Sequence, residues 1–540
     1  MTLPPARAAV LGLDLGTSRV KALLCAADGT VLGRGVAGYR VAAPRDGWAQ
    51  TDPEQWWRAA RSAVSAALGP APAEVAGLAV VGQMHGLILY AERAVVPSPA
   101  IIWLDGRASA EVGDYRRLPA DLRARLGNAP SAGMAGPILL WLSRHEPDAY
   151  RRARWMLSPK DWLRTRLTGE PATDPTDASG TLLYDLERDA WATDVAQALG
   201  LRTDLLPPIL ASTQVAGHLL PAAAEQLGLP PGLPVATGAA DTAASLLAAN
   251  LPGPEAPDWA LLTLGTGGQL IVPVPDSPVP NDRHPDTSFP DCPGLENTAR
   301  DDAGLGATNL FRSVGQGTYR LAGAQNVGAA LDWVRRTLGV SWDELYATAR
   351  RPWSSSTPVF LPYLAGERWG HRDSGGAWTG LTLAHGREDL MRAALEGVAF
   401  LLRSQLDELR AAGCAPAKVM LAGGGSTPPA WRQLLADVLG LPLYPAGTDE
   451  LTARGATLIA ATAAGTLPDT GTTARSEQKI GQAVSAADPF RLAETGYRRF
   501  GSSSSLPPKR LIPLYRDMSC TRGLAGRASS GKRSMPAWRR

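Results

Sequence analysis

Two similar segments, each a strand, a glycine-rich turn and a second strand, constrain the fold of this chain more than any other feature. The first turn, Gly16-Thr17-Ser18, lies between apolar stretches at 8–14 and 20–26. The second turn, at 265–268, lies within a similar apolar region from 260 to 274. A strand–turn–strand unit that occurs twice predicts a duplicated α/β architecture with a cleft between the halves. The length of 540 residues agrees, because one hydrophobic core rarely organises so long a chain.

Local signals predict further elements between and after these units. Asp52 can cap a helix whose first position is Pro53, a residue that favours the start of a helix. Short apolar runs bounded by turn residues are typical of strands. We therefore expect strands at 31–36, 78–81 and 234–237, and a loop or insertion at 275–306.

Glycine-rich turns after strands are candidate phosphate sites. A third such turn, Gly423-Gly424-Gly425-Ser426, joins the two already described. Glycine lets several backbone N–H groups converge on an anion, and Thr or Ser hydroxyls add donors. Each turn alone would be read as an ordinary tight turn, but three together, two of them similar, favour phosphate binding. The chain has no Walker lysine motif, and no Gly-x-Gly-x-x-Gly follows the first strand. The predicted phosphate-binding residues are Gly16, Thr17, Ser18, Gly265, Thr266, Gly267, Gly424 and Gly425.

Two aspartates stand beside strand ends and have two interpretations each. Asp14 is next to the first turn, where it could cap that turn or hold the hydrated Mg²⁺ that accompanies ATP. Asp241 lies between a short strand and an alanine-rich helix. It could be a helix N-cap, or a general base whose small neighbours leave room for a substrate hydroxyl; a part in metal binding is also open.

Two further motifs carry polar groups after apolar runs. Gln83-Met84-His85-Gly86 follows a predicted strand, and His85 is either a polar loop residue or a donor to sugar hydroxyls. Trp103-Leu104-Asp105-Gly106-Arg107 places an acid and a base two residues apart. A structural Asp–Arg pair is at least as good an interpretation of this second motif as direct catalysis.

Composition excludes several classes of protein. Hydrophobic residues make up 45% and charged residues 19%, as in ordinary globular proteins. No apolar run approaches the ~20 residues that span a bilayer, and the first ten residues lack the regions of a signal peptide. The expected location is therefore a reducing cytoplasm, with no membrane partner. The four cysteines agree with a reducing location, because they are scattered and lack metal-ligand spacing. They are Cys25, Cys292, Cys414 and Cys520.

The net charge of +3 is unevenly distributed. Residues 501–540 contain nine Lys or Arg and one Asp, which leaves the rest of the chain with a charge of −5. A mildly acidic body is a poor nucleic-acid binder, so we expect no nucleic-acid partner for it. The segment 501–540 mixes Ser, Pro and basic residues without apolar periodicity, so we predict a disordered tail without a catalytic role.

Taken together, the motifs resemble the FGGY family of carbohydrate kinases. The resemblance extends in order over about residues 8–465, most of the chain. It implies an actin-like (ribonuclease H-like) α/β fold of two domains with an interdomain cleft that holds ATP and a sugar. The segments that carry it are 14–18, 52–57, 83–86, 103–107, 157–163, 361–368, 376–396 and 422–426.

The resemblance also implies roles for individual residues. It assigns residues 1–248 to a sugar-binding domain and 249–480 to a nucleotide-binding domain. ATP and Mg²⁺ are the implied cofactors, with the first two glycine turns on the phosphates and 423–426 beside the adenosine. Asp241 is then the base, while Met84, His85 and Thr242 contact the sugar. The 83–86 element is similar to that of the xylulokinases within the family, which implies a ketopentose, D-xylulose, as the substrate.

Three positions depart from the xylulokinase pattern. Thr242 and Leu104 stand where Asn is usual, and Ile138 where the family has Lys. These changes leave the phosphate-binding turns intact and bear on the choice of sugar. A kinase for another ketose or polyol therefore remains an alternative, as does a non-catalytic sugar or nucleotide sensor. Retained Asp14, Asp241 and glycine turns disfavour the sensor, and a homodimer is an open option.

Overall fold

The computed structural model describes most of the two predicted halves. The predicted loop 275–306, Cys292, Cys520 and residues 365–368 of one family-like segment lie outside the described residues, as does the tail beyond Ser504. The described residues are 9–69, 74–91, 94–95, 99–251, 258–274, 308–364, 375–448, 450–467, 481–485 and 490–504.

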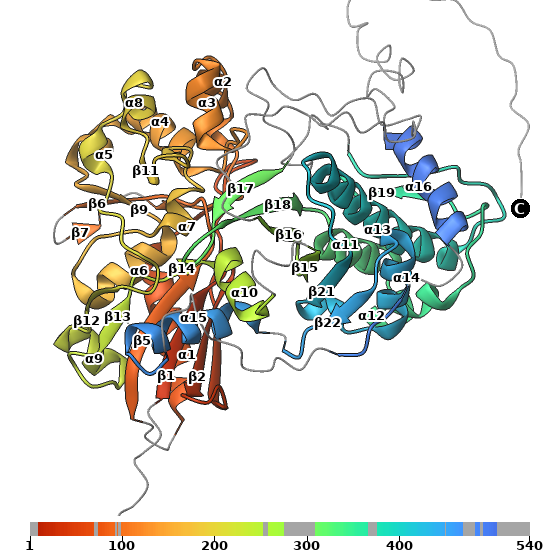
Figure 1. Ribbon diagram of the computed structural model, residues 1–540. Coiled ribbons are helices and arrows are strands. Elements are labelled where there is room, and N and C mark those ends of the chain that lie inside the picture. Colours follow the sequence, from red (N-terminus) through yellow and green to blue (C-terminus); the bar gives the residue numbers. More distant parts are fainter. Residues whose placement is uncertain are drawn as a thin grey trace, which may run out of the picture.

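Two twisted sheets form the centres of two lobes (Figure 1). In the N-terminal lobe β1 pairs antiparallel with β2, β2 pairs antiparallel with β3, and β1 pairs parallel with β5. β13 and β14 each extend the parallel side by pairing with β5. The strands of this sheet are β1 (Ala9–Leu15), β2 (Arg19–Ala26), β3 (Val31–Gly38), β5 (Val75–Gly82), β12 (Val215–His218), β13 (Pro234–Ala236) and β14 (Ala239–Ala240).

The second sheet repeats the topology of the first. β15 pairs antiparallel with β16 and parallel with β21, β16 pairs antiparallel with β18, and β22 adds in parallel to β21. The order β18-β16-β15-β21-β22 therefore matches β3-β2-β1-β5-β13, and the predicted duplicated α/β fold is confirmed. The strands are β15 (Trp259–Leu264), β16 (Gly268–Val274), β17 (Asn309–Arg312), β18 (Thr318–Ala324), β21 (Lys418–Ala422) and β22 (Leu443–Pro445).

A helix covers the first sheet at the position that the sequence predicted. α1 (Pro53–Leu68) begins at Pro53, and the Asp52 side chain accepts a hydrogen bond from the N–H of Glu54. Its small and aromatic face packs on β2 and β3, close enough that Gly33 and Gly35 are needed opposite the helix backbone. Trp56 of α1 and Trp162 of α6 (Pro159–Thr168) meet edge to face in the same core, with ring centres 6.0 Å apart.

The core of the C-terminal lobe surrounds one long helix, α13 (Arg387–Ala411), which packs against β18 and α14. α16 (Phe490–Ser504) closes this core, where Tyr497 and Phe500 contact Phe400. Residues 501–504 belong to that helix, so the prediction of disorder from residue 501 is wrong for these four residues. The helix continues because Tyr497 and Phe500 are buried. The other helices of this lobe are α11 (Gly328–Leu338), α12 (Trp342–Ala347) and α14 (Pro429–Leu439), with strands β19 (Val359–Leu361) and β20 (Ala377–Thr379).

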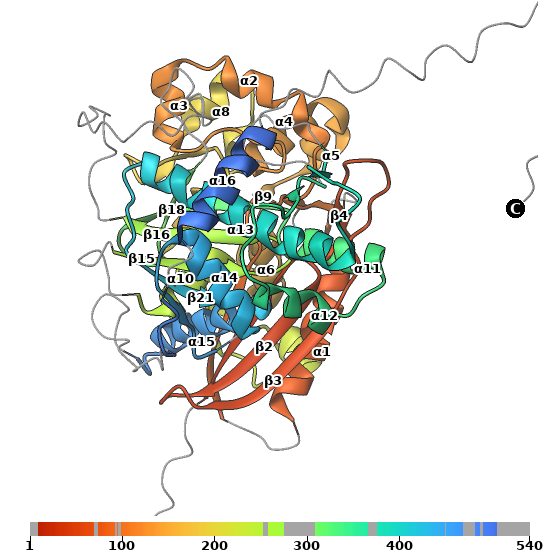
Figure 2. The same cartoon turned by 90° about the vertical axis from the view of Figure 1, so that its right-hand side faces the viewer.

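Most of the remaining elements extend the N-terminal lobe above its sheet (Figure 2). Apart from β4, which precedes β5, they connect β5 to β13 through short helices and strand pairs, and β17 of the C-terminal lobe contacts α7 (Pro175–Ala178) of this region. These elements are β4 (Gln50–Thr51), β6 (Ile88–Ala91), β7 (Ala94–Val95), β8 (Ala100–Ile101), α2 (Val112–Arg116), α3 (Ala120–Leu126), α4 (Ala135–His145), α5 (Pro147–Arg152), β9 (Trp155–Leu157), α7 (Pro175–Ala178), β10 (Tyr184–Asp185), β11 (Ala190–Trp191), α8 (Thr193–Ala198) and α9 (Pro221–Leu227).

Two helices join the lobes. α10 (Asp241–Ala249) packs against α15 (Leu451–Ala463), and α15 lies on β1 and β5 although it comes late in the chain. Figure 1 shows α15 as a blue helix beside the red and orange N-terminal strands. The contacts are very close, because a Cβ atom on Gly455 would lie 2.1 Å from the Ala244 carbonyl oxygen. A Cβ atom on Gly12 would lie 2.7 Å from the Ala453 carbonyl oxygen.

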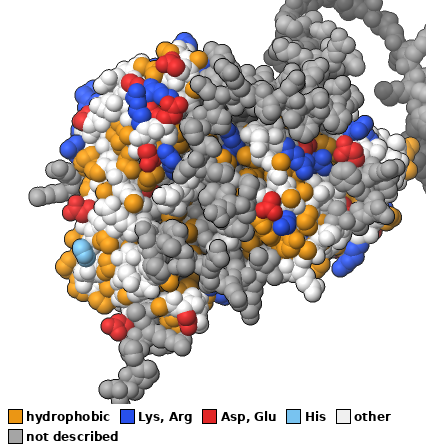
Figure 3. Space-filling view, viewed as in Figure 1, with side chains coloured by type: hydrophobic (Ala, Val, Ile, Leu, Met, Phe, Trp, Pro, Cys, Tyr) orange, Lys and Arg blue, Asp and Glu red, His pale blue; other side chains and the backbone are white. Residues whose placement is uncertain are grey.

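Charged side chains on the face shown in Figure 3 occur with both signs side by side. Arg144 contacts both Glu111 and Asp114, and Arg117 also contacts Asp114. No helix in the described part of the chain is long and apolar enough to cross a membrane.

We predict that Gly455→Ala destabilises the protein. The added methyl group would overlap the backbone of α10, and overpacking of this kind typically lowers the free energy of unfolding by about 1–3 kcal/mol. Denaturant unfolding measures the change. Gly375→Ala is the control, because its methyl group would meet no atom of the described part of the chain within 4 Å. Equal stability of the two variants would contradict the close packing of α10 on α15.

Candidate active site

Three parallel strands of the N-terminal sheet end at one edge and bring the predicted residues together. In the strand register Asp14 of β1 lies opposite Val81 of β5, and Ala240 of β14 lies opposite Gly82. The residues that follow these strand ends must therefore meet at the same edge. They are the first glycine turn, the Gln83–Gly86 element and Asp241.

Asp241 is the first residue of α10, not its N-cap. The N-cap position belongs to Ala240, which has no side chain that can cap the helix. Asp241 Oδ1 accepts hydrogen bonds from the backbone N–H and the hydroxyl of Thr242, at 2.7 and 3.2 Å. Among the described residues no hydrogen-bond donor reaches Oδ2, and the side chain is only partly buried. One carboxylate oxygen is thus held and the other faces outward.

The surroundings favour a proton or a cation on the two acids. Burial raises the pKa of Asp241 to about 7, and the nearby charge of Asp14 adds to the rise. Burial likewise raises the pKa of Asp14 to about 6, although Lys21 opposes it, with its Nζ 3.9 Å from Asp14 Oδ2. A carboxyl group with a pKa near neutrality can both accept and release a proton under physiological conditions.

In both predicted phosphate turns the glycine N–H closes the turn. Gly16 N–H donates to the Arg19 carbonyl at 3.0 Å, and Gly265 N–H donates to that of Gly267 at 2.8 Å. These two glycines shape the turns, and donors for an anion must come from the residues that follow each of them, Thr17 and Thr266.

Neighbouring side chains hold the first turn in place. The Tyr39 hydroxyl donates to the Gly16 carbonyl, and Trp103 Nε1–H donates to Thr17 Oγ1 at 2.9 Å. An indole N–H can only donate, so the Thr17 oxygen acts as acceptor here. Its own hydrogen is consequently directed to another acceptor, which is the arrangement that a phosphate oxygen requires.

The third glycine turn lies at the corresponding edge of the second sheet, after β21. Gly423 has φ of 90°, a conformation that favours glycine, and a Cβ there would lie 2.4 Å from the Leu264 carbonyl oxygen. A Cβ on Gly424 would meet no atom of the described residues within 4 Å. The outer side of this turn is therefore open, while its inner side packs on the end of β15.

The Met84-His85 pair lies where the two lobes meet. His85 has φ of 69°, and its Nδ1 is 2.8 Å from the Gly180 carbonyl oxygen. A carbonyl can only accept, so Nδ1 carries the hydrogen. The C-terminal lobe contributes Phe311, whose ring centre is 5.6 Å from that of His85, and Tyr319, whose hydroxyl donates to Met84 Sδ at 3.9 Å.

Sequence reasoning did not identify Phe311 or Tyr319. They follow a long segment without recognisable motifs, and only the pairing of β17 with β18 turns both rings toward one place. The one available signal was the presence of two aromatic residues in short apolar stretches.

Thr242 was predicted to bind the sugar, and the structure brings it beside Asp241. It is buried, and its hydroxyl lies 3.2 Å from Asp241 Oδ1 and 3.3 Å from Gln269 Oε1. Both neighbours are acceptors, so the hydroxyl hydrogen is directed to them. Thr242 thus ties Asp241 to β16 of the other lobe.

The Asp105–Arg107 motif forms the structural pair that was one of its two interpretations. Arg107 donates from Nε and from one terminal nitrogen to the two carboxylate oxygens, at 2.9 and 2.8 Å. The ion pair is buried, and the guanidinium carbon lies 3.7 Å from the ring centre of Trp48. Asp105 also accepts from the Ala49 N–H. These contacts occupy the groups that direct catalysis would need.

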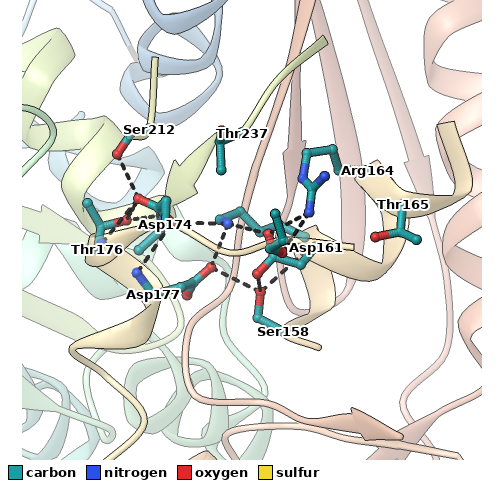
Figure 4. A network of polar contacts seen from close by, with 12 residues as sticks. Ser158, Asp161, Arg164, Thr165, Asp174, Thr176, Asp177, Ser212 and Thr237 are labelled. Atoms are coloured by element: carbon teal, nitrogen blue, oxygen red, sulfur yellow. Dashed lines mark hydrogen bonds and ion pairs between the residues drawn. The ribbon is translucent and has the colours of Figure 1, made fainter. Parts of the chain in front are cut away.

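A buried cluster of charges lies next to the site, and no function had been predicted for it. Lys160 Nζ is 2.6 Å from Asp161 Oδ1, 3.1 Å from Asp174 Oδ1 and 3.3 Å from Asp177 Oδ2. Figure 4 shows the three carboxylates around this amine, with Arg164 beside Asp161. All five side chains are essentially excluded from solvent. We refer to these five residues as the Lys160 cluster.

The cluster carries an imbalance of charge when every member is ionised. Two cations then face three carboxylates, and burial raises the pKa of Asp177 to about 8, with Lys160 opposing the rise. Asp177 Oδ1 has no hydrogen-bond partner in the described part of the chain. A proton on Asp177 neutralises the cluster.

A small cavity of about 20 Å³, room for roughly one water molecule, lies beside Asp177. His85, Ser158 and Thr181 also line it. The unpartnered carboxyl oxygen of Asp177 therefore belongs to a residue at the wall of a cavity, which apolar side chains such as Met156 and Leu157 also line.

Two sheets of one topology, glycine turns at corresponding edges and a paired set of acids define a phosphoryl-transferring fold of the actin-like class. Models of the FGGY family of carbohydrate kinases match residues 9–248 (N-terminal domain) and 262–464 (C-terminal domain). The chain belongs to this family, whose members use ATP as the phosphoryl donor.

Individual relatives cover nearly the whole length. The xylulose kinase of Escherichia coli is 35% identical over 461 residues, 84% of this chain and 90% of that protein. A glycerol kinase from Alkalilimnicola ehrlichii is 30% identical over 475 residues, 85% and 90% of the two chains. The structure of xylulose kinase from Rhodospirillum rubrum is 28% identical, with a TM-score of 0.75 over 92% of this chain and 98% of that one.

We predict different effects on stability for two substitutions in the Lys160 cluster. A native Asp177 that keeps its proton to about pH 8, against 3.8 when unfolded, releases it on unfolding between these values. Rising pH in this window therefore lowers the free energy of unfolding, and Asp177→Asn should make that energy less dependent on pH. Denaturant unfolding at pH 5 and pH 8 measures the difference.

Asp174→Asn is the matched comparison. Asp174 accepts from Lys160, Ser212 and Thr176, so an amide in its place removes acceptor capacity and a buried counter-charge. We expect a loss of about 3–5 kcal/mol, as for other broken buried ion pairs. If Asp177→Asn were as destabilising as Asp174→Asn at pH 5, where the native Asp177 keeps its proton, the assigned protonation of Asp177 would be wrong.

Proposed function

We propose that this protein transfers the γ-phosphoryl group of ATP to a primary hydroxyl of D-xylulose and produces D-xylulose 5-phosphate. The observation that carries the proposal is Asp241, a carboxylate with one open oxygen and a raised pKa that lies at the strand edge shared with Asp14 and the Gln83–Gly86 element. Several relatives named xylulose kinase, among them the one from Escherichia coli, support the choice of sugar.

Asp241 acts as the general base. Its Oδ2 accepts the proton of the sugar hydroxyl as the hydroxyl oxygen bonds to the γ-phosphorus. The bond from that phosphorus to the bridging oxygen then breaks, and ADP leaves with the electron pair. Catalysis of this kind depends on positioning and on donors to the developing charge, so the turns that bear Thr17, Ser18, Thr266 and Gly267 supply hydroxyl and backbone donors.

Asp14 and Asp241 fit a magnesium ion. Mg²⁺ usually binds one or two carboxylates, keeps several waters and shares the substrate phosphates, and no closed protein cage is needed. The described residues contain no group of three or more His, Cys, Asp or Glu side chains that could hold a metal. Asp14 would hold the ion through water, with Asp241 as a second carboxylate. The ion would neutralise the charge that develops on the phosphates.

The adenosine side of ATP is assigned to the third glycine turn. Gly424 and Gly425 stand at the end of β21, and the open side of Gly424 leaves room for a ligand at the backbone. Gly16 and Gly265 contribute by shaping the phosphate turns, since their N–H groups are already engaged.

A kinase for another ketose or for a polyol is the second candidate. The Thr242 hydroxyl is directed to Asp241 and Gln269, so the contact that an Asn would make with a sugar is missing. The glycerol kinase relative, at 30% identity, keeps polyols in consideration. A cytoplasmic location and a homodimer remain expectations from the sequence.

We predict that D-xylulose is the best substrate among common pentuloses, hexuloses and polyols, with a raised KM because of Thr242. Coupled detection of ADP release over this panel measures kcat/KM for each sugar. Tenfold more efficient turnover of glycerol or ribulose would contradict the choice of xylulose and leave the kinase class intact.

We predict that Asp241→Asn reduces kcat at least a hundredfold, since general-base catalysis is typically worth about 10²–10⁴-fold. The amide keeps an oxygen to accept from the Thr242 N–H, so folding and ATP affinity should stay near those of the parent. Asp241→Ala should lose the same activity and, in addition, some stability.

A purely structural role gives another pattern. Asn would then be nearly neutral, and Ala would cost about 1 kcal/mol of stability with turnover kept. Measurement of kcat, ATP affinity and melting temperature for both variants distinguishes the two roles. An Asp241→Asn enzyme with ordinary kcat would rule out the general base.

A further inference from the structure

A single hydroxyl connects the Lys160 cluster to the strand that carries the proposed base. Thr176 Oγ1 lies 2.7 Å from Asp174 Oδ2 and 2.8 Å from the backbone nitrogen of Ala240. The directions are fixed by chemistry, because the carboxylate can only accept and the N–H can only donate. Thr176 therefore donates to Asp174 and accepts from Ala240.

The carboxylate that orients this hydroxyl is itself fixed. Asp174 Oδ2 also accepts from the Thr176 N–H at 3.1 Å and from Ser212 Oγ at 2.7 Å. Asp174 Oδ1 is 3.1 Å from Lys160 Nζ. Figure 4 shows Ser212 and Thr176 directed at the two sides of Asp174. A buried group with this many partners has little freedom to move.

Ala240 is the residue immediately before Asp241. It ends β14, which has only two residues and pairs with β5, and it is fully buried. It is also the N-cap of α10, without a side chain that could hold the start of the helix. The Thr176 hydroxyl thus supplies from another element the side-chain contact that this helix start lacks.

We propose that Thr176 is a positioning residue for Asp241, and that the Lys160 cluster serves as its fixed support. The hydroxyl holds the Ala240 N–H and sets where α10 begins, which sets where the Asp241 carboxylate meets the sugar. This inference rests on the proposed function of Asp241 as the base.

Thr176→Val tests the contact. The methyl group that replaces the hydroxyl leaves the Ala240 N–H without an acceptor and pushes β14 away from a 2.8 Å contact. A misplacement of about 1 Å can cost on the order of 10²-fold in rate. We expect kcat to fall roughly ten- to a hundredfold, with the KM for ATP unchanged, because the glycine turns are untouched. Thr176→Ser keeps the hydroxyl and should restore most of kcat.

Ser212→Ala is the matched control. It removes a hydrogen bond to the same oxygen of Asp174, also of 2.7 Å, but among the described residues the Ser212 hydroxyl has no hydrogen bond to β14. We expect Ser212→Ala to lower the melting temperature and to leave kcat near that of the parent. If Ser212→Ala and Thr176→Val reduced kcat alike, the effect would be a general loss of stability and the positioning role would be overturned.

Hydrogen exchange at the Ala240 amide gives a second readout that needs no substrate. Exchange should become faster in Thr176→Val and stay slow in Thr176→Ser and Ser212→Ala. Unchanged exchange would overturn the contact itself, whatever the sugar. Faster exchange with normal kcat would show that the contact exists but does not position a base. This result would overturn the inference and would also contradict the role of Asp241 as the base. If Thr176→Val did not fold, Thr176→Ala would be measured in its place with the same expected outcomes.

Discussion

Parallel pairing of β5 with β1 on one side and β14 on the other is the constraint on which the site depends. The register puts Leu15 and Ala240 both opposite Gly82, so the three strands end together. A shift of one residue in either pair would turn Asp14 away from the edge and carry Asp241 along the strand direction. The same close pairing of strands explains the glycine at this edge, since a Cβ on Gly82 would lie 3.1 Å from the Leu15 carbonyl oxygen.

The second constraint is the exchange of helices between the lobes. α15 comes from the C-terminal half of the chain and packs on β1 and β5, where Gly12 lets its backbone approach. The same helix crosses α10 at Gly455, in contact with the Ala244 carbonyl. The helix that carries Asp241 is therefore packed against an element that continues into the other lobe. A relative movement of the lobes acts on the base through this crossing.

The sequence predicted the features that repeat and those that depend on local signals. The strand–turn–strand units and the Asp52–Pro53 helix start are governed by residues close in sequence, and the predicted strands of these units agree with the structure within two residues at their ends. The strand predicted at 78–81 begins three residues earlier, at Val75. The contribution of Phe311 and Tyr319, the support from Thr176 and the last turn of α16 depend on pairing between distant segments. A single sequence does not encode such pairing in any local pattern. Residues 501–504 therefore resemble a polar tail in the sequence, although the helix that contains them is held by the contact of Phe500 with Phe400.

Two groups of acids lie near the ends of β5 and β14 and differ in what balances their charge. The carboxylates around Lys160 have two cations and many donors, and a proton on Asp177 completes the balance. Such a cluster has no need of a ligand, and its geometry is fixed. At Asp14 and Asp241 the chain provides Lys21 at 3.9 Å and the donors of Thr242, and the pKa values of both acids stay raised. The site is therefore left with unbalanced negative charge, which a proton from a hydroxyl or a cation bound with nucleotide would relieve. The difference makes the first group a support and the second a reactive centre.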